Sequence, residues 1–133
     1  MNFKNWLAKE NFNNFPEGER KKFAIQASLL SKYDTNILLK DQNGDILGIA
    51  SVWKEADDTN DDEIPSGKYI RIRNMAVKEK GLGEKLFDLI EQYAKEKNAG
   101  IFLNSTYNSE KFYIKQGMKR GTGLNYYLTL TDL

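Results

Sequence analysis

The sequence contains no cysteine and no histidine among its 133 residues. Without cysteine there is no disulfide, no thiolate nucleophile and no sulfur-ligated metal. Without histidine the commonest general base and the commonest metal ligand are both missing, so Ser-His-Asp and Cys-His catalytic arrangements are excluded. Any catalysis must run on Tyr, Glu, Asp, Lys, Ser, backbone amides and water, and we expect no bound metal. This favours direct transfer between two bound substrates over a covalent enzyme intermediate.

Strong net charge and long hydrophobic runs are missing too. Lys plus Arg number 20 and Asp plus Glu number 19, a net charge of +1 that gives no overall field to attract nucleic acid or an anionic membrane. The longest apolar stretches, such as residues 46–53, are far too short to span a bilayer, and the opening residues show no secretory pattern. We therefore expect a cytoplasmic protein without nucleic-acid or membrane partners. Its length and 40% hydrophobic content suit a single domain over residues 1–133.

Apolar spacing predicts helices at the N-terminus and a sheet after them. A short helix is expected over residues 3–12, and a second from Pro16 to about Tyr33. Asn43-Gly44 lies between two apolar runs and predicts a β-hairpin with a type I′ turn. Further along we expect strands over residues 69–77, 101–103 and 125–130, with helices over residues 82–98 and 108–116. This order predicts an α/β or α+β layered domain with one main sheet.

The apolar alternation within the strand at residues 69–77 changes parity. Ile70 and Ile72 share one face, whereas Met75 and Val77 have the opposite parity. A β-bulge near residues 73–74 would restore a common apolar face. In a strand buried on both faces the parity would not matter. The sequence leaves both interpretations open.

The segment most informative about chemistry is strand, Gly81-Leu82-Gly83, helix. Glycines here let the backbone approach a ligand closely, and the free amides and dipole of a helix N-terminus favour a phosphate or pyrophosphate. A Walker loop is excluded, because it would need Gly-Lys-Ser/Thr at its end. A dinucleotide-binding fingerprint would need glycine or alanine where Leu86 stands. The remaining interpretation is the pyrophosphate of coenzyme A.

Two segments resemble the GNAT (Gcn5-related N-acetyltransferase) family. Residues 78–83, Lys-Glu-Lys-Gly-Leu-Gly, are similar to its Gln/Arg-x-x-Gly-x-Gly/Ala motif. Residues 108–118, Asn-Ser-Glu-Lys-Phe-Tyr-Ile-Lys-Gln-Gly-Met, are similar to its Asn-containing helix that ends in Phe-Tyr-x-Lys-x-Gly-Phe. Lys78 in place of Gln/Arg, Met118 in place of Phe and the lack of an obvious first strand depart from the family pattern.

The resemblance spans about residues 46–119, and it implies a fold and an activity. The fold is a mixed, mostly antiparallel sheet flanked by helices, with a bulged central strand and a phosphate-binding strand-loop-helix. The activity is transfer of an acetyl group from acetyl-CoA to an amine in a ternary complex. The alternative is a non-catalytic module of the same fold that binds coenzyme A or a partner protein.

The resemblance also implies roles for individual residues. Tyr113 would be the general acid for the leaving thiolate, against the simpler interpretation of a core aromatic residue beside Phe112. Strand backbone would pair with the pantetheine arm, loop and helix amides would hold the pyrophosphate, and an asparagine would contact the cofactor near its thiol or pantetheine end. The implied cofactor-binding residues are Met75, Ala76, Val77, Lys80, Gly81, Leu82, Gly83, Glu84, Lys85, Asn104, Asn108 and Tyr113.

The general base and the acceptor are the open points. Glu55 is the candidate base, acting through water, although a solvated acid at the start of a loop has the same appearance. The acidic segment 55–63 suits either a cationic acceptor or a solvated loop, and Arg71 and Arg73 suit either an anionic group or cross-strand pairing. We expect a small-molecule or peptide amine as acceptor, and a homodimer is compatible with the sequence.

Overall fold

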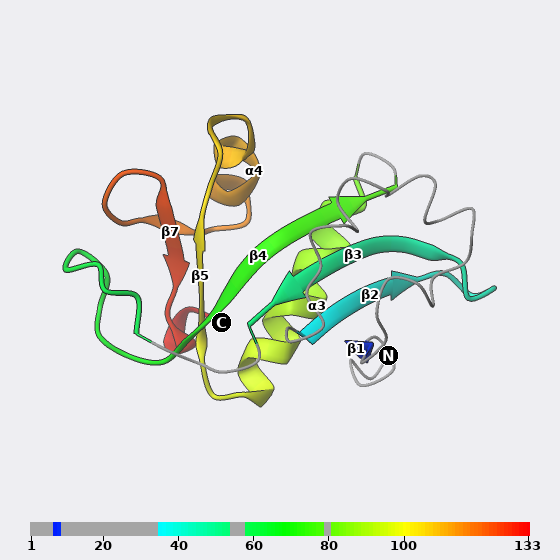
Figure 1. The fold of residues 1–133 in the computed structure, drawn as a ribbon, viewed down its shortest axis with the longest axis horizontal. Helices are drawn as coiled ribbons and strands as arrows, with labels where there is room; N and C mark the ends of the chain where they lie inside the picture. Colours follow the sequence, from blue (N-terminus) through cyan, green and yellow to red (C-terminus); the bar gives the residue numbers. More distant parts are fainter. Residues whose placement is uncertain (1–6, 9–34, 54–57, 79–80) are drawn as a thin grey trace.

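The computed structural model describes residues 7–8, 35–53, 58–78 and 81–133, in which seven strands form one sheet (Figure 1). The order across the sheet is β1-β2-β3-β4-β5-β7-β6. Neighbouring strands are antiparallel except β4 and β5, which are parallel. The predicted mixed, mostly antiparallel sheet is therefore confirmed. The strands are Leu7–Ala8 (β1), Thr35–Lys40 (β2), Ile46–Val52 (β3), Tyr69–Val77 (β4), Gly100–Asn104 (β5), Lys119–Arg120 (β6) and Asn125–Leu128 (β7).

The main helix of the described residues, α3 (Gly83–Glu96), packs against strands β2 to β5 (Figure 1). Its apolar residues recur at helical spacing, so a single stripe enters the core between helix and sheet. Asn98 follows the helix with φ 53°, a left-handed conformation that stops further helical turns where the sequence predicted the end. The buried residues of α3 are Leu86, Phe87, Leu89, Ile90, Tyr93 and Ala94.

A shorter helix, α4 (Glu110–Lys115), follows the 3-10 turn η3 (Tyr107–Ser109). It covers the part of the chain where the sequence predicted a helix over residues 108–116. Figure 1 shows α4 at the upper end of β5, while β4 diverges from β5 toward the right of the view. The helix therefore stands at the carboxyl end of the parallel pair.

The predicted bulge in β4 is confirmed. Ser51 of β3 pairs with Asn74, but the adjacent Val52 pairs with Ile72, so Arg73 is the extra residue of the longer strand. After the bulge, Met75 and Val77 pack against the same core as Ile70 and Ile72. The change of parity in the sequence is thus the result of one inserted residue.

The hairpin between β2 and β3 forms, but its turn differs from the predicted type I′. A type I′ turn needs positive φ at both Asn43 and Gly44, whereas only Gly44 has it, at 84°. The Gly44 amide donates to the Asp41 carbonyl at 3.1 Å, and the Asp41 carboxylate accepts from the Asn43 and Asp45 amides at 2.8 and 3.0 Å. Asp41 therefore stabilises a turn with negative φ at Asn43, followed by a left-handed glycine.

The helix predicted over residues 3–12 is wrong at its centre. Leu7 and Ala8 form the edge strand β1, paired with Ile37 and Asn36 of β2. Backbone hydrogen bonds to a strand distant in sequence have overridden the local helical spacing, and this strand supplies the first strand that the sequence did not show. The helix predicted from Pro16 to about Tyr33 lies outside the described residues.

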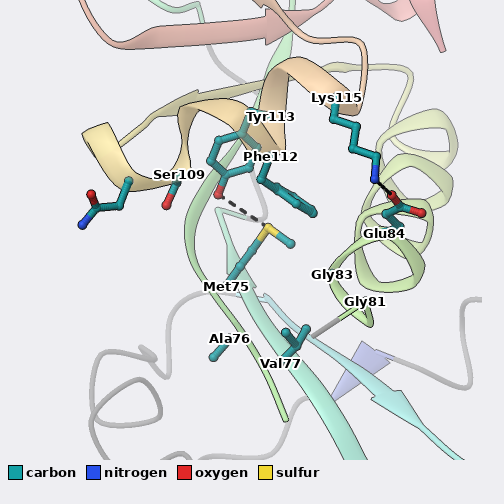
Figure 2. Close-up of a pocket in the computed structure, with 11 residues that line it drawn as sticks. Met75, Ala76, Val77, Gly81, Gly83, Glu84, Ser109, Phe112, Tyr113 and Lys115 are labelled. Atoms are coloured by element: carbon teal, nitrogen blue, oxygen red, sulfur yellow. Dashed lines mark hydrogen bonds and ion pairs between the residues drawn. The ribbon is translucent and has the colours of Figure 1, made fainter. Parts of the chain in front are cut away.

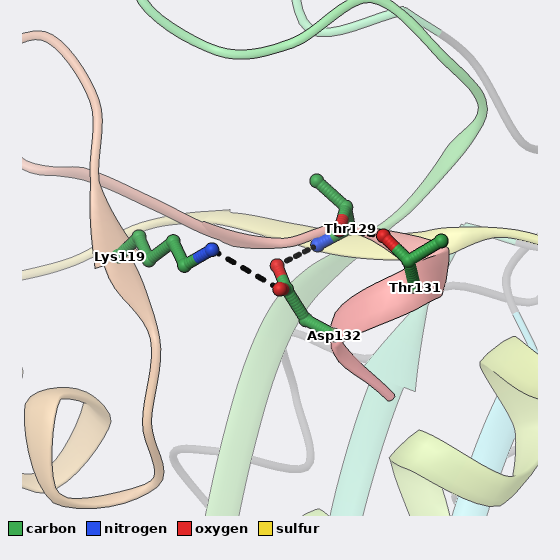
Figure 3. A network of polar contacts seen from close by, with 4 residues as sticks. All are labelled: Lys119, Thr129, Thr131 and Asp132. Carbon is green, nitrogen blue, oxygen red and sulfur yellow. Dashed lines mark hydrogen bonds and ion pairs between the residues drawn. The ribbon is translucent and has the colours of Figure 1, made fainter.

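The C-terminal strand ends at Leu128, two residues earlier than predicted. Thr129 begins a 3-10 turn, η4 (Leu130–Asp132), whose Asp132 carboxylate accepts from the Thr129 amide at 2.8 Å (Figure 3). The same carboxylate pairs with Lys119 of β6 at 3.0 Å. These contacts lower the pKa of Asp132 and tie the chain end to the neighbouring strand.

The two faces of the sheet carry apolar clusters of very different size. The main core lies between the sheet and α3, and a small cluster of Ile64, Tyr69 and Phe102 lies on the other face. The face opposite α3 is therefore the more open one in the described part of the chain.

No helix among the described residues is long and apolar enough to cross a membrane.

Candidate functional site

A cleft of ≈ 440 Å³ lies between the end of β4, the start of α3, and α4 (Figure 2). Its walls come from segments that are separate in sequence but meet where β4 and β5 diverge. The parallel pairing of these strands ends at Arg71 with Phe102, six residues before the end of β4. The lining residues are Met75, Ala76, Val77, Gly81, Gly83, Glu84, Asn108, Ser109, Phe112, Tyr113 and Lys115.

The end of β4 presents backbone hydrogen-bonding groups to this cleft. The Lys78 amide donates to the Leu47 carbonyl of the β3 side at 2.8 Å. Backbone groups of successive strand residues point to opposite sides, so those of Met75 and Val77 point away from β3. An extended ligand that carries amide groups can pair with this edge as an additional strand would.

The start of α3 forms the wall nearest Gly81. Gly81 has φ 95°, which favours glycine, and a β-carbon built there would have no atom within 4 Å. The first-turn amides of α3 have no intrahelical carbonyl to bind, and Leu82 at the N-cap position has an apolar side chain that cannot cap them. These amides and the helix dipole make this wall suitable for an anionic group such as a pyrophosphate.

Gly83 has a different role from Gly81. A β-carbon on Gly83 would lie 2.8 Å from the Phe112 ring, so glycine here allows α4 to approach the start of α3 closely. The two helices are also joined by an ion pair between Lys115 and Glu84 at 3.1 Å. Lys115 thus offsets a negative charge at the helix end that would otherwise repel an anionic ligand.

Tyr113 lies at the inner end of the cleft and points toward β4 (Figure 2). Its hydroxyl donates to the Met75 sulfur at 3.7 Å. The ring packs against Phe112 and Phe87, with centroid distances of 5.2 and 6.5 Å. Burial raises the pKa of the Tyr113 phenol above its ordinary value, so the hydroxyl stays protonated at neutral pH and can donate a hydrogen bond.

The structure brings most of the predicted site residues together in this cleft. Leu82 packs against the core beside it, and Lys85 is exposed on α3 outside the lining. Asn108 lines the cleft, whereas Asn104 lies in a second pocket and donates to Asn125 at 2.8 Å. Lys80 and Glu55 lie outside the described residues. Those in the lining are Met75, Ala76, Val77, Gly81, Gly83, Glu84, Asn108 and Tyr113.

Three lining residues were not predicted as site residues: Ser109, Phe112 and Lys115. All three fall within residues 108–118, the segment that resembles the family's second motif. Helical spacing could have identified two of them, because Ser109 and Phe112 are three residues apart and therefore lie on the same face of the helical segment.

The described part of the acidic loop has a structural role. The Asp61 carboxylate accepts hydrogen bonds from the Thr122 amide and hydroxyl at 2.8 and 2.7 Å and from the Asn125 side chain at 2.9 Å. These bonds hold the pKa of Asp61 well below its usual range. Among the described residues, no cluster of three or more acidic side chains is placed to hold a metal ion. Asp61 therefore connects the loop to β7 and the turn before it.

Comparison with known proteins identifies the family and the fold. Residues 1–118 match the model of the acetyltransferase (GNAT) family. No curated protein matches the chain. Similar solved structures include a tyrosine-to-phenylalanine mutant of KacT, with a TM-score of 0.64 and 12% identity over 95% of this chain and 96% of that chain. At such identities a structural likeness shows the fold alone.

Two further structures share this fold. AtaT complexed with acetyl-methionyl-tRNAfMet has a TM-score of 0.61 and 11% identity over 98% of this chain and 89% of that chain. Tetrahymena GCN5 has a TM-score of 0.57 and 10% identity over 94% of this chain and 85% of that chain. Both matches extend over most of the two chains.

Proposed function

The chain belongs to the acetyltransferase (GNAT) family, and on this basis we propose that it transfers an acetyl group from acetyl-CoA to an amine in a ternary complex. The observation that carries the proposal is the cleft itself. It combines a β4 edge at Met75 and Val77 to which no other described strand is paired, a helix N-terminus at Gly83 and the Tyr113 hydroxyl. These are a partner for an amide-containing arm, a site for a pyrophosphate and a hydrogen-bond donor for a leaving sulfur.

In the proposed arrangement each wall of the cleft holds a different part of acetyl-CoA. The backbone of Met75 and Val77 pairs with the pantetheine arm, and amides of residues 80–85 hold the pyrophosphate. Asn108 contacts the pantetheine end. The thioester then lies toward the inner end of the cleft, where Tyr113 stands.

In the proposed reaction the amine nitrogen bonds to the carbonyl carbon of the thioester and the carbon–sulfur bond breaks. Tyr113 donates its hydrogen bond or proton to the departing sulfur, and the amine loses a proton to water. A thiol has a pKa of about 8.5, below that of the phenol, so stabilisation by the hydrogen bond outweighs full proton transfer. We keep Glu55 as the candidate base that receives the amine proton through water.

We propose a small amine as the acceptor. AtaT, which shares the fold, is complexed with acetyl-methionyl-tRNAfMet. This chain has a net charge of +1, and a tRNA-sized partner would require a strongly basic surface.

The test is isothermal titration of the protein with acetyl-CoA, beside Gly81→Asp and Gly81→Asn. Both residues bring the same backbone strain at φ 95° and have nearly the same shape, so the pair differs mainly in charge. We expect saturable binding to the wild type and to Gly81→Asn, and a Kd at least about tenfold higher for Gly81→Asp, or about 1.4 kcal/mol. Absence of binding to the wild type would reject acetyl-CoA as the substrate.

A non-catalytic coenzyme A-binding module is the second candidate. It is favoured by the lack of an available base in the described cleft, where the only lining carboxylate, Glu84, is paired with Lys115. Release of free thiol from acetyl-CoA, measured over a panel of amines, separates the two functions. Binding without amine-dependent thiol release would support the module.

A further inference from the structure

A second pocket, of ≈ 310 Å³, lies where β4 and β5 stop pairing. We call it the Arg71 pocket. Ile72 and Val52 are buried in the core that the sheet forms with α3. Their neighbours along the strands, Arg71 and Trp53, therefore lie on the opposite face of the sheet. The pocket is lined by Trp53, Arg71, Ile72, Arg73 and Asn104.

Two guanidinium groups gather on one indole ring in this pocket. Arg71 and Arg73 lie 5.8 and 5.5 Å from the Trp53 ring centroid, and Arg71 also lies 5.5 Å from that of Phe102. Among the described residues, no carboxylate forms an ion pair with Arg71. Aromatic faces thus hold cationic groups at a site that the described residues leave open, since Trp53 is 40% exposed.

The Arg71 pocket borders the cleft through β4. Arg71 belongs to the last β4–β5 pair, and Asn104 lies two residues beyond that pair on β5. Met75, which contacts the Tyr113 hydroxyl, is two residues beyond Arg73, or roughly 7 Å along the strand. A small molecule in the pocket would therefore place a neighbouring group near the inner end of the cleft.

We infer that the Arg71 pocket binds an anionic group of the acceptor, so that the substrate is a small amine with a phosphate or carboxylate close to its amino group. This inference rests on the proposed function. Planar guanidinium groups bind both kinds of anion through paired hydrogen bonds. Asn104 adds a polar side chain whose orientation is set by Asn125. The volume of the pocket suits a compact group, and a net charge of +1 does not suit a long polyanion.

Binding can be measured with Trp53 as the reporter. The chain has two tryptophans, so Trp6→Phe leaves Trp53 as the single source of indole emission. This protein is titrated with O-phosphoethanolamine, with β-alanine and, at matched ionic strength, with ethanolamine as the amine without an anion. The same titrations are made with Arg71→Gln and Arg73→Gln added, and with Arg71→Lys, which keeps the charge but loses the planar fork.

We expect a saturable change in Trp53 emission with at least one of the two anionic amines and none with ethanolamine. The apparent Kd should rise by about ten- to a hundredfold in Arg71→Gln, the range of a lost charge-assisted contact, and by less in Arg71→Lys. The better ligand of the two identifies the anion as phosphate or carboxylate. The inference is wrong if neither anionic amine changes the emission, or if both Arg→Gln variants respond as their parent does.

A ten-nucleotide oligouridylate serves as the competitor that tests for nucleic acid. If it displaces the small amine and its affinity falls steeply with salt, the pocket belongs to a nucleic-acid surface and the small acceptor is wrong. The acetyl-CoA titration separates this inference from the proposed function. Anion binding without acetyl-CoA binding would reject the proposed function and with it the role of the anion as part of an acceptor, whereas acetyl-CoA binding without anion binding would reject the acceptor class alone.

Discussion

At the scale of single residues, the surroundings of Tyr113 leave its hydroxyl with only a weak hydrogen-bond acceptor among the described residues. Its hydroxyl contacts the Met75 thioether, which is a weak acceptor, at 3.7 Å. Its ring packs against Phe112 and Phe87, so the hydroxyl is directed toward β4, where its bond partner among the described residues is the thioether alone. A departing thiolate is a much stronger acceptor, and the hydroxyl can transfer its hydrogen bond at little cost.

Tyr113→Phe should therefore lower kcat by roughly 100-fold while the Kd for acetyl-CoA stays close to that of the wild type. The substitution removes only the hydroxyl and leaves the ring packing in place. Turnover at saturating acetyl-CoA and isothermal titration measure the two quantities. Because burial raises the pKa of Tyr113, its ionisation should add no limb to the rate profile between pH 6 and about 9.

Thermal unfolding of both proteins controls for a structural effect. The contact with a thioether is weak, so we expect similar midpoints. Unchanged kcat in the variant would show that Tyr113 is a packing residue, the simpler interpretation of its sequence.

Asn104 and Asn108 show how far residue roles could be predicted. The family resemblance allowed either to contact the cofactor, and only Asn108 lines the cleft. Leu103 is buried in the main core, so strand alternation directs the next side chain, Asn104, to the other face. That signal was present in the sequence, but it required knowledge of which face the cleft occupies.

At the scale of elements, prediction succeeded where the signal was local. The bulge in β4 is visible within nine residues, because Ile72 and Met75 have opposite parity yet share one core. The strand β1 was missed because Leu7 pairs with Ile37, thirty positions along the chain, and local spacing does not report that contact. The role of Asp61 was missed for the same reason, since Thr122 lies 61 positions away.

The hydrogen bonds from Thr122 and Asn125 to the Asp61 carboxylate, which we call the Asp61 clamp, predict that stability depends on pH in the acid range. The folded-state pKa of Asp61 is lowered, so its contribution is present above the unfolded pKa of about 3.9 and is lost as the pH falls below it toward the folded value. Asp61→Asn should unfold at lower urea concentration than the wild type at pH 7. The difference between the two proteins should shrink as the pH decreases from 4 to about 2.5.

Asp62→Asn is the matched control, because it removes the same charge from the adjacent exposed residue. Its urea midpoint at pH 7 should stay near that of the wild type. A wild-type advantage over Asp61→Asn that is the same at pH 7 and at pH 3 would show that shape, not charge, accounts for the clamp.

At the scale of the whole molecule, the sheet has two parts joined by a short ladder. Strands β1 to β4 form one part and β5 to β7 the other, and the join consists of residues 69–71 paired with residues 100–102. Beyond the join no other described strand pairs with this edge of β4, while α3 packs against both parts of the sheet. Binding of an extended ligand should therefore complete the hydrogen bonding of the sheet.

Amide hydrogen exchange tests this expectation directly. In the free protein the Met75 and Val77 amides, which point away from β3, should exchange faster than that of Ala76, which points toward it. Acetyl-CoA at 100 times its Kd should slow the two fast amides by up to about 100-fold, equivalent to about 2.7 kcal/mol. Gly81→Asp at the same ligand concentration should show a smaller effect. If the Met75 and Val77 amides exchange as slowly as the Ala76 amide without ligand, the edge of β4 is not open. If the two amides still exchange fast at saturation with acetyl-CoA, the ligand does not pair with this edge. A backbone hydrogen bond to either amide would have to break before that amide could exchange.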